Sequence, residues 1–460
     1  MAATKIVIHV QNGSFLPDDR TVVLNAALVK RWKIPTGSEI GLHYGSQRKT
    51  VSVVTAAKIT SMRLHEALAS HLGIHQGARL CISYSPETKT LRVGPIVGVL
   101  VSRTTSDPEK PFGPISSFCR ELTSACKAYG GLVYFFTPED IPASAHSILG
   151  WVYTDKWTRK SFPIPDIVYN RLTTRKLENS PGVQQFMREA KSRFATIIFN
   201  EKYLNKTEVF QALQKDGALQ SYLPESHLFK DYLTLKKMCG KYGTVFLKPV
   251  TGSLGKGIIR ITKLPNSTYQ CHYAGMAGIR KQSFPKLAPL YSSISGKMKT
   301  RSYQIQQGLK LLEVSERPVD FRALVQRGKT GDWEITSTVA RIAGSETFVS
   351  NLARGGTLSP VQDAIMKTNL ISTHKAAVPQ RINKAALEIA KGIETQIDAH
   401  FAELGIDLAV DPYGKVWLLE VNSKPSKDDN SPLHAAAAPD KIRPSVRQIV
   451  RYSQHLAKFR

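Results

Sequence analysis

Residues 405–425 read GIDLAVDPYGKVWLLEVNSKP, and this stretch carries the clearest indication of a functional site in the chain. Two short apolar strands, 406–410 and 416–421, flank a turn in which proline fixes φ and glycine allows a positive φ. Each predicted strand contains one acid, Asp407 in the first and Glu420 in the second. A carboxylate inside an apolar strand is costly unless its charge is compensated, so both positions are functional candidates.

A third oxygen donor joins these two acids. Asn422 follows Glu420 by two residues, and because strand side chains alternate with a period of two, both lie on one face. If the two strands pair, Asp407 completes a set of hard oxygen ligands without Cys or His. Such a set suits Mg²⁺ or Mn²⁺ rather than zinc. The alternative is that the acids are solvated at strand ends and bind nothing.

The composition is that of an ordinary globular protein. The chain has 460 residues, enough for about two to four domains, and 42% of them are hydrophobic. No long apolar run predicts a membrane span, and the N-terminus lacks the layout of a signal peptide. The five cysteines lack CxxC spacing, which argues for a reducing compartment and against a disulfide framework or a zinc site.

The net charge of +27 is the unusual bulk feature. Residues 201–300 carry the largest excess, with 16 Lys and Arg against 5 Asp and Glu. Such a charge favours anionic partners, which include phosphates, polyacids and nucleic acid. The alternative is that the charge serves solubility alone.

The first ninety residues contain an internal repeat. Residues 24–53 and 64–93 match at a constant offset of forty, with the same residue at both positions of nine pairs. The matching positions are Leu24/Leu64, Ala27/Ala67, Leu28/Leu68, Ile34/Ile74, Gly37/Gly77, Tyr44/Tyr84, Lys49/Lys89, Thr50/Thr90 and Val53/Val93. Two copies can bury apolar faces that one copy could not bury alone. We expect residues 1–94 to form a small β-barrel with pseudo-twofold symmetry, which binds nucleic acid or serves as a docking module.

Residues 95–200 alternate strand, helix and strand, which predicts a parallel α/β layer of the Rossmann type. The apolar strand before Asn170 and Arg171 makes these two residues candidates for a substrate cleft at its carboxyl end. A turn or an ion pair is the more common role for such residues.

Residues 244–250 form an apolar strand containing Lys248, followed by the glycine-rich loop 251–257 and a second strand. The loop joins strand to strand, so it is neither a P-loop nor a dinucleotide fingerprint, both of which open a helix. Its backbone N–H groups could instead approach a polyphosphate closely. A buried ammonium at Lys248 fits a phosphate partner, although a lysine whose amine reaches solvent is the alternative.

Other donors surround these segments. Asn205 is a good N-cap for a helix beginning at Lys206, where a cation opposes the helix dipole unless it meets an anion. Three arginines are suited to forked contacts with phosphate or carboxylate: Arg322, Arg341 and Arg354. Asn351 adds a nearby amide. A core-facing helix is expected over residues 382–404, because its apolar residues recur at three- and four-residue steps.

Residues 200–425 resemble the ATP-grasp fold. The resemblance implies phosphate-binding lysines at Lys206 and Lys248, with Lys202 as a substitute for the first, and a phosphate-covering loop at 252–257. It implies nucleotide contacts and metal ligands at the following positions: Gly252, Ser253, Gly255, Lys256, Gly257, Gln306, Gln307, Leu309 and Asp320 for ATP, and Asp407, Glu420 and Asn422 for magnesium. Ser426 stands where the family normally has glycine after Glu-x-Asn-x-x-Pro, which leaves the shape of that loop open.

Almost the whole chain resembles the YheC/YheD family of endospore coat-associated proteins. The segments that carry the resemblance are 94–98, 162–171, 246–257, 320–322 and 407–425. It implies a multidomain protein of mixed α+β and α/β class: a barrel (1–94), a Rossmann-like pre-ATP-grasp domain (95–200) and an ATP-grasp domain (201–460). The last comprises a nucleotide lobe at about 201–309 and a metal-binding lobe at about 310–460.

The family resemblance implies an ATP-dependent carboxylate–amine or carboxylate–thiol ligase that acts through an acyl phosphate. Lys248, Arg322, Arg341 and Arg354 would then act on the reacting groups, and Asn170, Arg171 and Asn351 on the substrate. The implied partners are ATP, Mg²⁺ or Mn²⁺, a carboxylate with an anionic acceptor, and spore-coat or envelope components in the bacterial cytoplasm or the spore. A non-catalytic ATP-binding coat scaffold and a nucleic-acid or anionic-polymer binder with salt-sensitive affinity are the alternatives.

Overall fold

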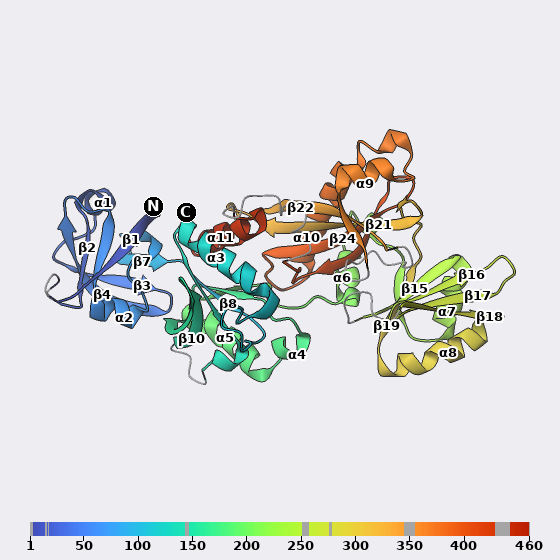
Figure 1. Ribbon diagram of the computed structural model, residues 1–460, viewed down its shortest axis with the longest axis horizontal. Coiled ribbons are helices and arrows are strands. Elements are labelled where there is room, and N and C mark those ends of the chain that lie inside the picture. The colour runs from blue at the N-terminus through green and yellow to red at the C-terminus, as the bar shows by residue number, and fades with distance from the viewer. Residues whose placement is uncertain are drawn as a thin grey trace.

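The computed structural model describes residues 3–13, 16, 18–142, 147–250, 257–275, 278–344, 355–427 and 442–459. The molecule is elongated, with four sheets arranged along its length (Figure 1). The barrel lies at one end and the sheet containing β15–β18 at the other, while both chain termini lie near the junction of the barrel with its neighbouring sheet (Figure 1).

The N-terminal segment is a closed barrel with strand order β1-β5-β2-β4-β3-β7-β6. Its elements are β1 (Thr4–Gln11), β2 (Thr21–Asn25), α1 (Ala26–Trp32), β3 (Glu39–Tyr44), β4 (Gln47–Ala56), β5 (Ser61–His65), α2 (Glu66–Leu72), β6 (Arg79–Ser85) and β7 (Thr90–Gly94). The order strand–helix–strand–strand occurs twice, as β2-α1-β3-β4 and β5-α2-β6-β7, and these two units contain the two copies of the repeated sequence.

The two copies end their helices in the same way but with different residues. Lys33 closes α1 and Gly73 closes α2, and both adopt left-handed backbone, with φ of 54° and 73°. Glycine takes this conformation freely, whereas a residue with a Cβ is strained in it. The strain at Lys33 is therefore a local cost that the second copy of the repeat avoids.

The second sheet has the order β11-β10-β9-β8-β12-β13, in which β9, β8, β12 and β13 run parallel and β10 pairs antiparallel with both β9 and β11. Its elements are β8 (Ile96–Leu100), α3 (Ser116–Tyr129), β9 (Leu132–Phe136), β10 (Ser147–Tyr153), β11 (Trp157–Pro163), β12 (Ile167–Asn170), α4 (Arg175–Glu178), α5 (Pro181–Phe194) and β13 (Ile197–Phe199). All five residues of β8 and of β9 are buried, as expected for the central strands of a parallel sheet.

The third sheet is antiparallel, with the order β14-β19-β15-β16-β17-β18. Its elements are β14 (Ser226–Phe229), α7 (Tyr232–Lys241), β15 (Thr244–Pro249), β16 (Ile259–Lys263), β17 (Tyr269–Gly275), β18 (Gly278–Phe284), α8 (Leu287–Thr300) and β19 (Tyr303–Gln307). Helices α7 and α8 lie against one face of this sheet (Figure 1), and their apolar side chains form its core.

The fourth sheet is antiparallel, with the order β23-β22-β21-β24-β25 and β20 paired to β21. Its elements and the helices near it are α6 (Lys206–Leu213), β20 (Glu313–Val314), β21 (Arg317–Arg327), β22 (Trp333–Ile342), β23 (Thr357–Pro360), α9 (Val361–Lys367), α10 (Val378–Gln396), β24 (Glu403–Val410), β25 (Val416–Asn422) and α11 (Pro444–Leu456). Helix α10 covers this sheet with one apolar face.

The helix expected over residues 382–404 is shorter in the structure and ends at Gln396. Ile397 is already extended, and Leu404 belongs to β24. Phe401 and Leu404 are buried in the same core as the helix, so their spacing continued the helical pattern although the chain had changed conformation. Apolar spacing reports burial, and here burial continued past the end of the helix.

One core crosses the first boundary expected in the sequence. The barrel interior and the face of the α/β layer form a single cluster of buried apolar residues, which includes Leu42 and Tyr84 from the barrel and Leu100 and Phe162 from the layer.

Among the described residues, no helix is long and apolar enough to cross a membrane.

We predict that Lys33→Gly stabilises the protein by about 1 kcal/mol, because it removes the strain of a Cβ in left-handed backbone. The matched change Gly73→Ala should destabilise it, since φ is +73° there and the new Cβ would lie 3.0 Å from the Ser161 carbonyl oxygen. Urea denaturation followed by circular dichroism measures both. Equal stability of the Lys33→Gly variant and the unaltered protein would contradict the prediction.

Candidate functional site

Lys248 lies on β15, a strand whose side chains alternate between the core and the other face of the sheet. Its ammonium donates a hydrogen bond to Oε1 of Gln306 on the adjacent strand β19. Among the described residues, no carboxylate forms an ion pair with it. Burial and the positive charge of Lys206 together lower the pKa of Lys248 to about 8, while the charge of Glu420 opposes the shift. This lysine is therefore a buried cation whose charge is incompletely compensated.

Lys206 and Glu420 bring the remaining charge to the same place. Lys206 is the first residue of α6, whose N-cap Asn205 accepts a hydrogen bond from the Glu208 N–H, as the sequence predicts. The Lys206 Nζ lies 2.9 Å from Oε1 of Glu420 on β25. Lys202 instead pairs with Glu208, so Lys206 is the lysine that faces the strand pair β24–β25.

The predicted metal ligands come from paired strands. Asp407 of β24 lies opposite Glu420 of β25, and an irregularity in register follows directly, where Leu408 pairs with Leu418. Asn422 lies two residues further along β25, opposite Gly405. Among the described residues, no three His, Cys, Asp or Glu side chains form a metal cluster. The predicted ligand set has only two carboxylates, so the amide of Asn422 has to supply the third donor.

Two arginines hold Asp407. Arg322 on β21 forms a forked pair with this carboxylate, in which its Nη2 lies 3.0 Å from Oδ2. Arg341 on β22 lies 3.1 Å from the same oxygen and 2.6 Å from Oδ1 of Asp320. All four side chains are at least nine-tenths buried. Burial would raise the pKa of Asp407, but the charges of Arg322 and Arg341 hold it below its ordinary value.

Gly405 makes room for this cluster. A Cβ at this position would lie 3.1 Å from Nη1 of Arg322 and 3.0 Å from the Pro425 side chain. The sequence stretch that contains both predicted ligand strands thus also needs a glycine where Arg322 approaches Asp407. Asp320, implied by the resemblance as an ATP contact, pairs with Arg341 inside this cluster.

Strand β19, which holds the implied ATP contacts Gln306 and Gln307, carries a row of amides. The Gln306 side chain is buried and bridges the Lys248 ammonium and the Ser226 hydroxyl, while Gln307 accepts a hydrogen bond from the Glu225 N–H. Sequence reasoning missed Gln304, which pairs with Lys248 in register. Gln304 is 3% exposed, and its Oε1 accepts no hydrogen bond within the described part of the chain. Its position two residues before Gln306 was the available signal.

The two candidates at the end of β12 lie in a buried contact between the second and fourth sheets. Asn170 is fully buried and donates hydrogen bonds to Glu178 and to the Glu201 carbonyl oxygen. Arg171 lies 3.4 Å from Glu403, the first residue of β24, and donates a hydrogen bond to the Pro425 carbonyl oxygen. Asn170 therefore points into the protein rather than into a cleft, while Arg171 supports the chain that follows the ligand strands.

The buried carboxylate of Glu403 is surrounded by two cations and two hydrogen-bond donors. Its carboxylate accepts hydrogen bonds from Tyr169 and Gln326 and pairs with Arg171 and Lys427. Burial would raise the pKa of Glu403, yet the charges of Lys427 and Arg171 keep it below its ordinary value. Sequence reasoning missed Glu403 because it was assigned to the preceding helix.

Six of the predicted site residues lie outside the described residues: Gly252, Ser253, Gly255, Lys256, Asn351 and Arg354. Gly257 is described and has a φ of +76°, which a residue with a side chain rarely adopts. Leu309 follows β19 and is half-buried.

Residues 195–456 match the family described as YheC/D like ATP-grasp. The chain belongs to this family. The ATP-grasp fold expected from the sequence is thereby confirmed, and the third and fourth sheets are the parts of the YheC/D-like chain that carry the candidate site.

Relatives of this YheC/D-like chain occur in Bacillus subtilis (strain 168). Endospore coat-associated protein YheD is 28% identical over 339 residues, which are 74% of this chain and 74% of that protein. Endospore coat-associated protein YheC is 22% identical over 322 residues, 68% of this chain and 85% of that protein.

Solved structures of ligases are similar in outline. D-alanine–D-alanine ligase from Bacillus anthracis has a TM-score of 0.48 at 14% identity, covering 79% of this chain and 98% of that one. D-alanyl-alanine synthetase A from Vibrio cholerae has a TM-score of 0.45 at 13% identity, covering 79% of this chain and 98% of that one.

We predict that Lys248→Met raises the midpoint of thermal unfolding at pH 7, because the unaltered protein buries a charge there. The pKa of Lys248 is about 8 in the folded protein and 10.5 in the unfolded chain. Between pH 8 and pH 10.5 the unfolded chain therefore binds more protons than the folded protein does. The unaltered protein therefore gains stability relative to the variant as pH rises from about 8. Calorimetry of both proteins at pH 7 and pH 9.5 measures the difference, which should shrink at the higher pH. A difference that is unchanged or larger at pH 9.5 would count against a buried charged lysine.

Proposed function

We propose that this protein binds magnesium-ATP between the third and fourth sheets and uses it to activate a carboxylate. The observation that carries the proposal is the convergence of Lys248, Lys206 and Glu420. These residues come from three separate elements, and their charges act on one another. A buried and incompletely compensated lysine needs a strong anion, which a triphosphate provides.

The residues present fit both groups. The carboxylates of Asp407 and Glu420 with the amide of Asn422 are hard oxygen donors on paired strands, as magnesium requires. A buried acceptor at Gln304 is available for a ligand N–H group such as the adenine amine. A bound magnesium ion would supply neutralisation of charge on the phosphate oxygens.

The proposed reaction needs no nucleophile from the protein. A substrate carboxylate oxygen attacks the γ-phosphorus of ATP, the bond from that phosphorus to the bridging oxygen breaks, and ADP leaves. An amine then attacks the carbonyl carbon of the acyl phosphate, inorganic phosphate leaves, and the nitrogen loses a proton. Lys248 and Lys206 hold the phosphates in position and oppose their negative charge, which is the main requirement of phosphoryl transfer.

Arg322 and Arg341 position Asp407 in this proposal. Their contacts with Asp407 and Asp320 fix the carboxylate that faces Glu420. Their fixed charge is also close to the site where the acyl phosphate would form, since Asp407 lies opposite Glu420 on the neighbouring strand. Positioning through packed, charged neighbours costs no rearrangement during the reaction.

We further propose the division of the chain into a barrel (1–94), a Rossmann-like layer (95–200) and an ATP-grasp domain (201–460). The closed first sheet and the parallel strands of the second sheet support it. The basic charge of +27 supports an anionic acceptor, for example an acidic peptide or an envelope polymer. The names of the two Bacillus relatives support an association with the spore coat.

Replacing one ligand tests nucleotide binding. We predict that Glu420→Gln weakens the binding of magnesium-ATP by about tenfold or more, because it removes one charged ligand of the metal. Isothermal titration with ATP, with and without magnesium, measures the change. Glu189→Gln, at a half-buried acid of α5 that pairs with Arg193 outside the proposed site, is the matched control and should bind as the unaltered protein does. Equal magnesium-dependent affinity in the Glu420→Gln variant would overturn the site.

A trapping experiment separates catalysis from binding alone. Hydroxylamine captures an acyl phosphate as a hydroxamate, so ATP, magnesium, an acidic peptide and hydroxylamine should together yield hydroxamate and ADP. Glu420→Gln should abolish the product, and Glu189→Gln should not. ATP binding without ADP release across a panel of acids and amines would instead support a non-catalytic ATP-binding protein.

A further inference from the structure

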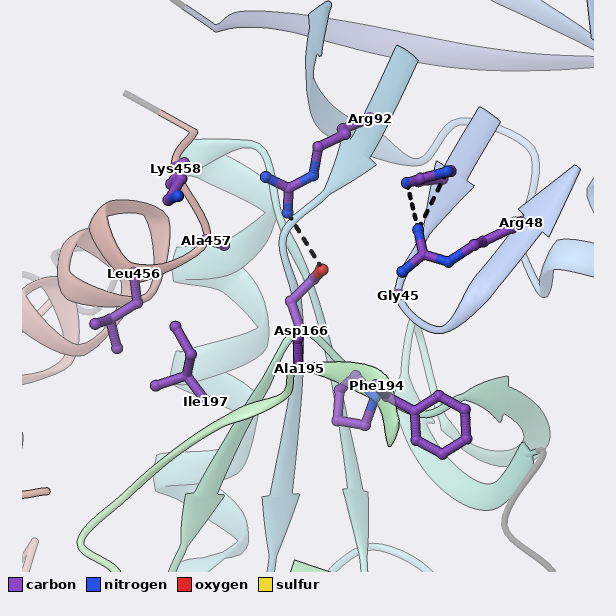
Figure 2. Close-up of a pocket in the computed structure, with 12 residues that line it drawn as sticks. Gly45, Arg48, Arg92, Asp166, Phe194, Ala195, Ile197, Leu456, Ala457 and Lys458 are labelled. Atoms are coloured by element: carbon purple, nitrogen blue, oxygen red, sulfur yellow. Dashed lines mark hydrogen bonds and ion pairs between the residues drawn. The ribbon is translucent and has the colours of Figure 1, made fainter. Parts of the chain in front are cut away.

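A second cavity lies far from the nucleotide site, where the barrel, the α/β layer and the end of α11 meet (Figure 1, Figure 2). Its volume is about 330 Å³, within the range of small-molecule sites. It is lined by His43, Gly45, Arg48, Arg92, Pro165, Asp166, Phe194, Ala195, Ile197, Leu456, Ala457 and Lys458. None of these residues belongs to the third or fourth sheet, so the cavity is separate from the proposed ATP site.

Positive charge dominates its polar wall. Arg48 and Arg92 come from the barrel strands β4 and β7, and Lys458 follows the end of α11. Within the described chain, neither Arg48 nor Lys458 forms an ion pair, and Arg48 donates a hydrogen bond to the His43 ring. Burial and the charges of Arg48 and Arg92 lower the pKa of His43 to about 4, so this ring is neutral at pH 7.

One carboxylate faces these three cations. Asp166 accepts a hydrogen bond from the Ile96 N–H at 2.9 Å, and Nη2 of Arg92 lies 3.7 Å from its Oδ1. Figure 2 shows the Arg92 guanidinium directed at the Asp166 carboxylate, with Lys458 on the α11 side and Arg48 on the other. The Arg92 side chain remains 34% exposed, and its guanidinium lies over the Phe459 ring. The cations thus exceed the single carboxylate by two.

The rest of the wall is apolar. Phe194 and Ile197 come from the α/β layer, Leu456 is the last residue of α11, and Ala457 follows it. The carboxyl ends of α5 and α11 also reach the cavity and contribute partial negative charge, which falls off within one turn. Three full cations outweigh these partial charges, and the two guanidiniums offer the planar, forked donors that suit oxyanions.

We propose that this cavity binds a small, multiply charged oxyanion that carries a short apolar portion, as a phosphate monoester or a polycarboxylate does. Arg48, Arg92 and Lys458 contact the charged group, and Phe194, Ile197 and Leu456 contact the apolar portion. Because the lining comes from both chain ends and from the α/β layer, an occupant joins the barrel to the remainder of the molecule. The site is therefore placed to sense a metabolite rather than to react with it.

Titration calorimetry of the full chain with phenyl phosphate, inorganic phosphate and citrate tests the proposal. Phenyl phosphate should bind more tightly than inorganic phosphate because it fills the apolar wall, and binding by citrate distinguishes the polycarboxylate source from the phosphate source. The double variant Arg48→Ala with Lys458→Gly should weaken binding at least about tenfold, through the loss of two charged contacts. Lys458 has a φ of +60°, so glycine suits its backbone and the double variant is expected to fold.

Three further variants make the assignment specific. Lys49→Ala removes the same charge from an exposed position next to Arg48 and should leave binding unchanged. Lys248→Met should also leave it unchanged, which excludes binding at the proposed ATP site. Asp166→Asn keeps an acceptor for the Ile96 N–H but removes the negative charge, and should tighten binding about threefold or more.

The outcomes separate clearly. Binding lost in the cavity variants, kept in Lys49→Ala and Lys248→Met, and tightened in Asp166→Asn supports an oxyanion site. The absence of binding to the unaltered protein by any of the three probes overturns the proposal. So does equal binding in the double variant, or weaker binding in Asp166→Asn, which would indicate a cationic ligand. If the double variant does not fold, Arg48→Ala alone gives the same readout, since within the described chain its side chain bonds only to the half-buried ring of His43.

Discussion

Strand β24 has all eight of its residues buried, and two of them, Glu403 and Asp407, are acids. Because an uncompensated carboxylate is very costly without water, each acid requires cations from elsewhere in the chain. Arg322 and Arg341 compensate Asp407, and Arg171 and Lys427 compensate Glu403. This requirement fixes which strands and which segments must lie against β24, and much of the remaining architecture follows from it.

The two acids connect different parts of the molecule. Asp407 is held by neighbouring strands of its own sheet, so its cluster is local and rigid. Glu403 draws Arg171 and Tyr169 from the α/β layer and Lys427 from the chain beyond β25. Burial lowers the pKa of Lys427 to about 8, although the charge of Glu403 opposes the shift. The contact between the layer and the fourth sheet is therefore built from charges that lose their compensation if the two parts separate.

The proposed ATP site follows a different rule. Lys248 lies opposite Gln304 on its own sheet, and Glu420 and Lys206 come from elements outside that sheet. The charge of Lys248 is left incompletely compensated, while Asp407 and Glu403 each face two cations. A stable protein tolerates such a residue where a ligand completes the charge balance, and the cost to stability is then part of the function. The cavity beside the barrel shows a similar excess, in that case of arginine and lysine over a single acid.

The sequence by itself determined the local elements and much of the chemistry. The forty-residue repeat marked two similar copies in the first ninety residues, Asn205 predicted the start of α6, and the turn at 411–414 predicted the pairing that places Asp407 opposite Glu420. These features depend on neighbours close along the chain or on a pattern of fixed period. The sequence also led us to expect that cations or a metal would compensate the acids of the two apolar strands, and in the structure cations face both Asp407 and Glu420.

Only the tertiary structure decided which cations provide that compensation. Arg341 and Asp407 are far apart in the sequence, and nothing local distinguishes Arg341 from an arginine on the surface. The same is true of Glu403 with Arg171, and of the three cations around Asp166, which meet because distant segments pack together. Charge compensation depends on distance in space, whereas a sequence records distance along the chain, so buried ion pairs and cavities appear only when the chain is folded.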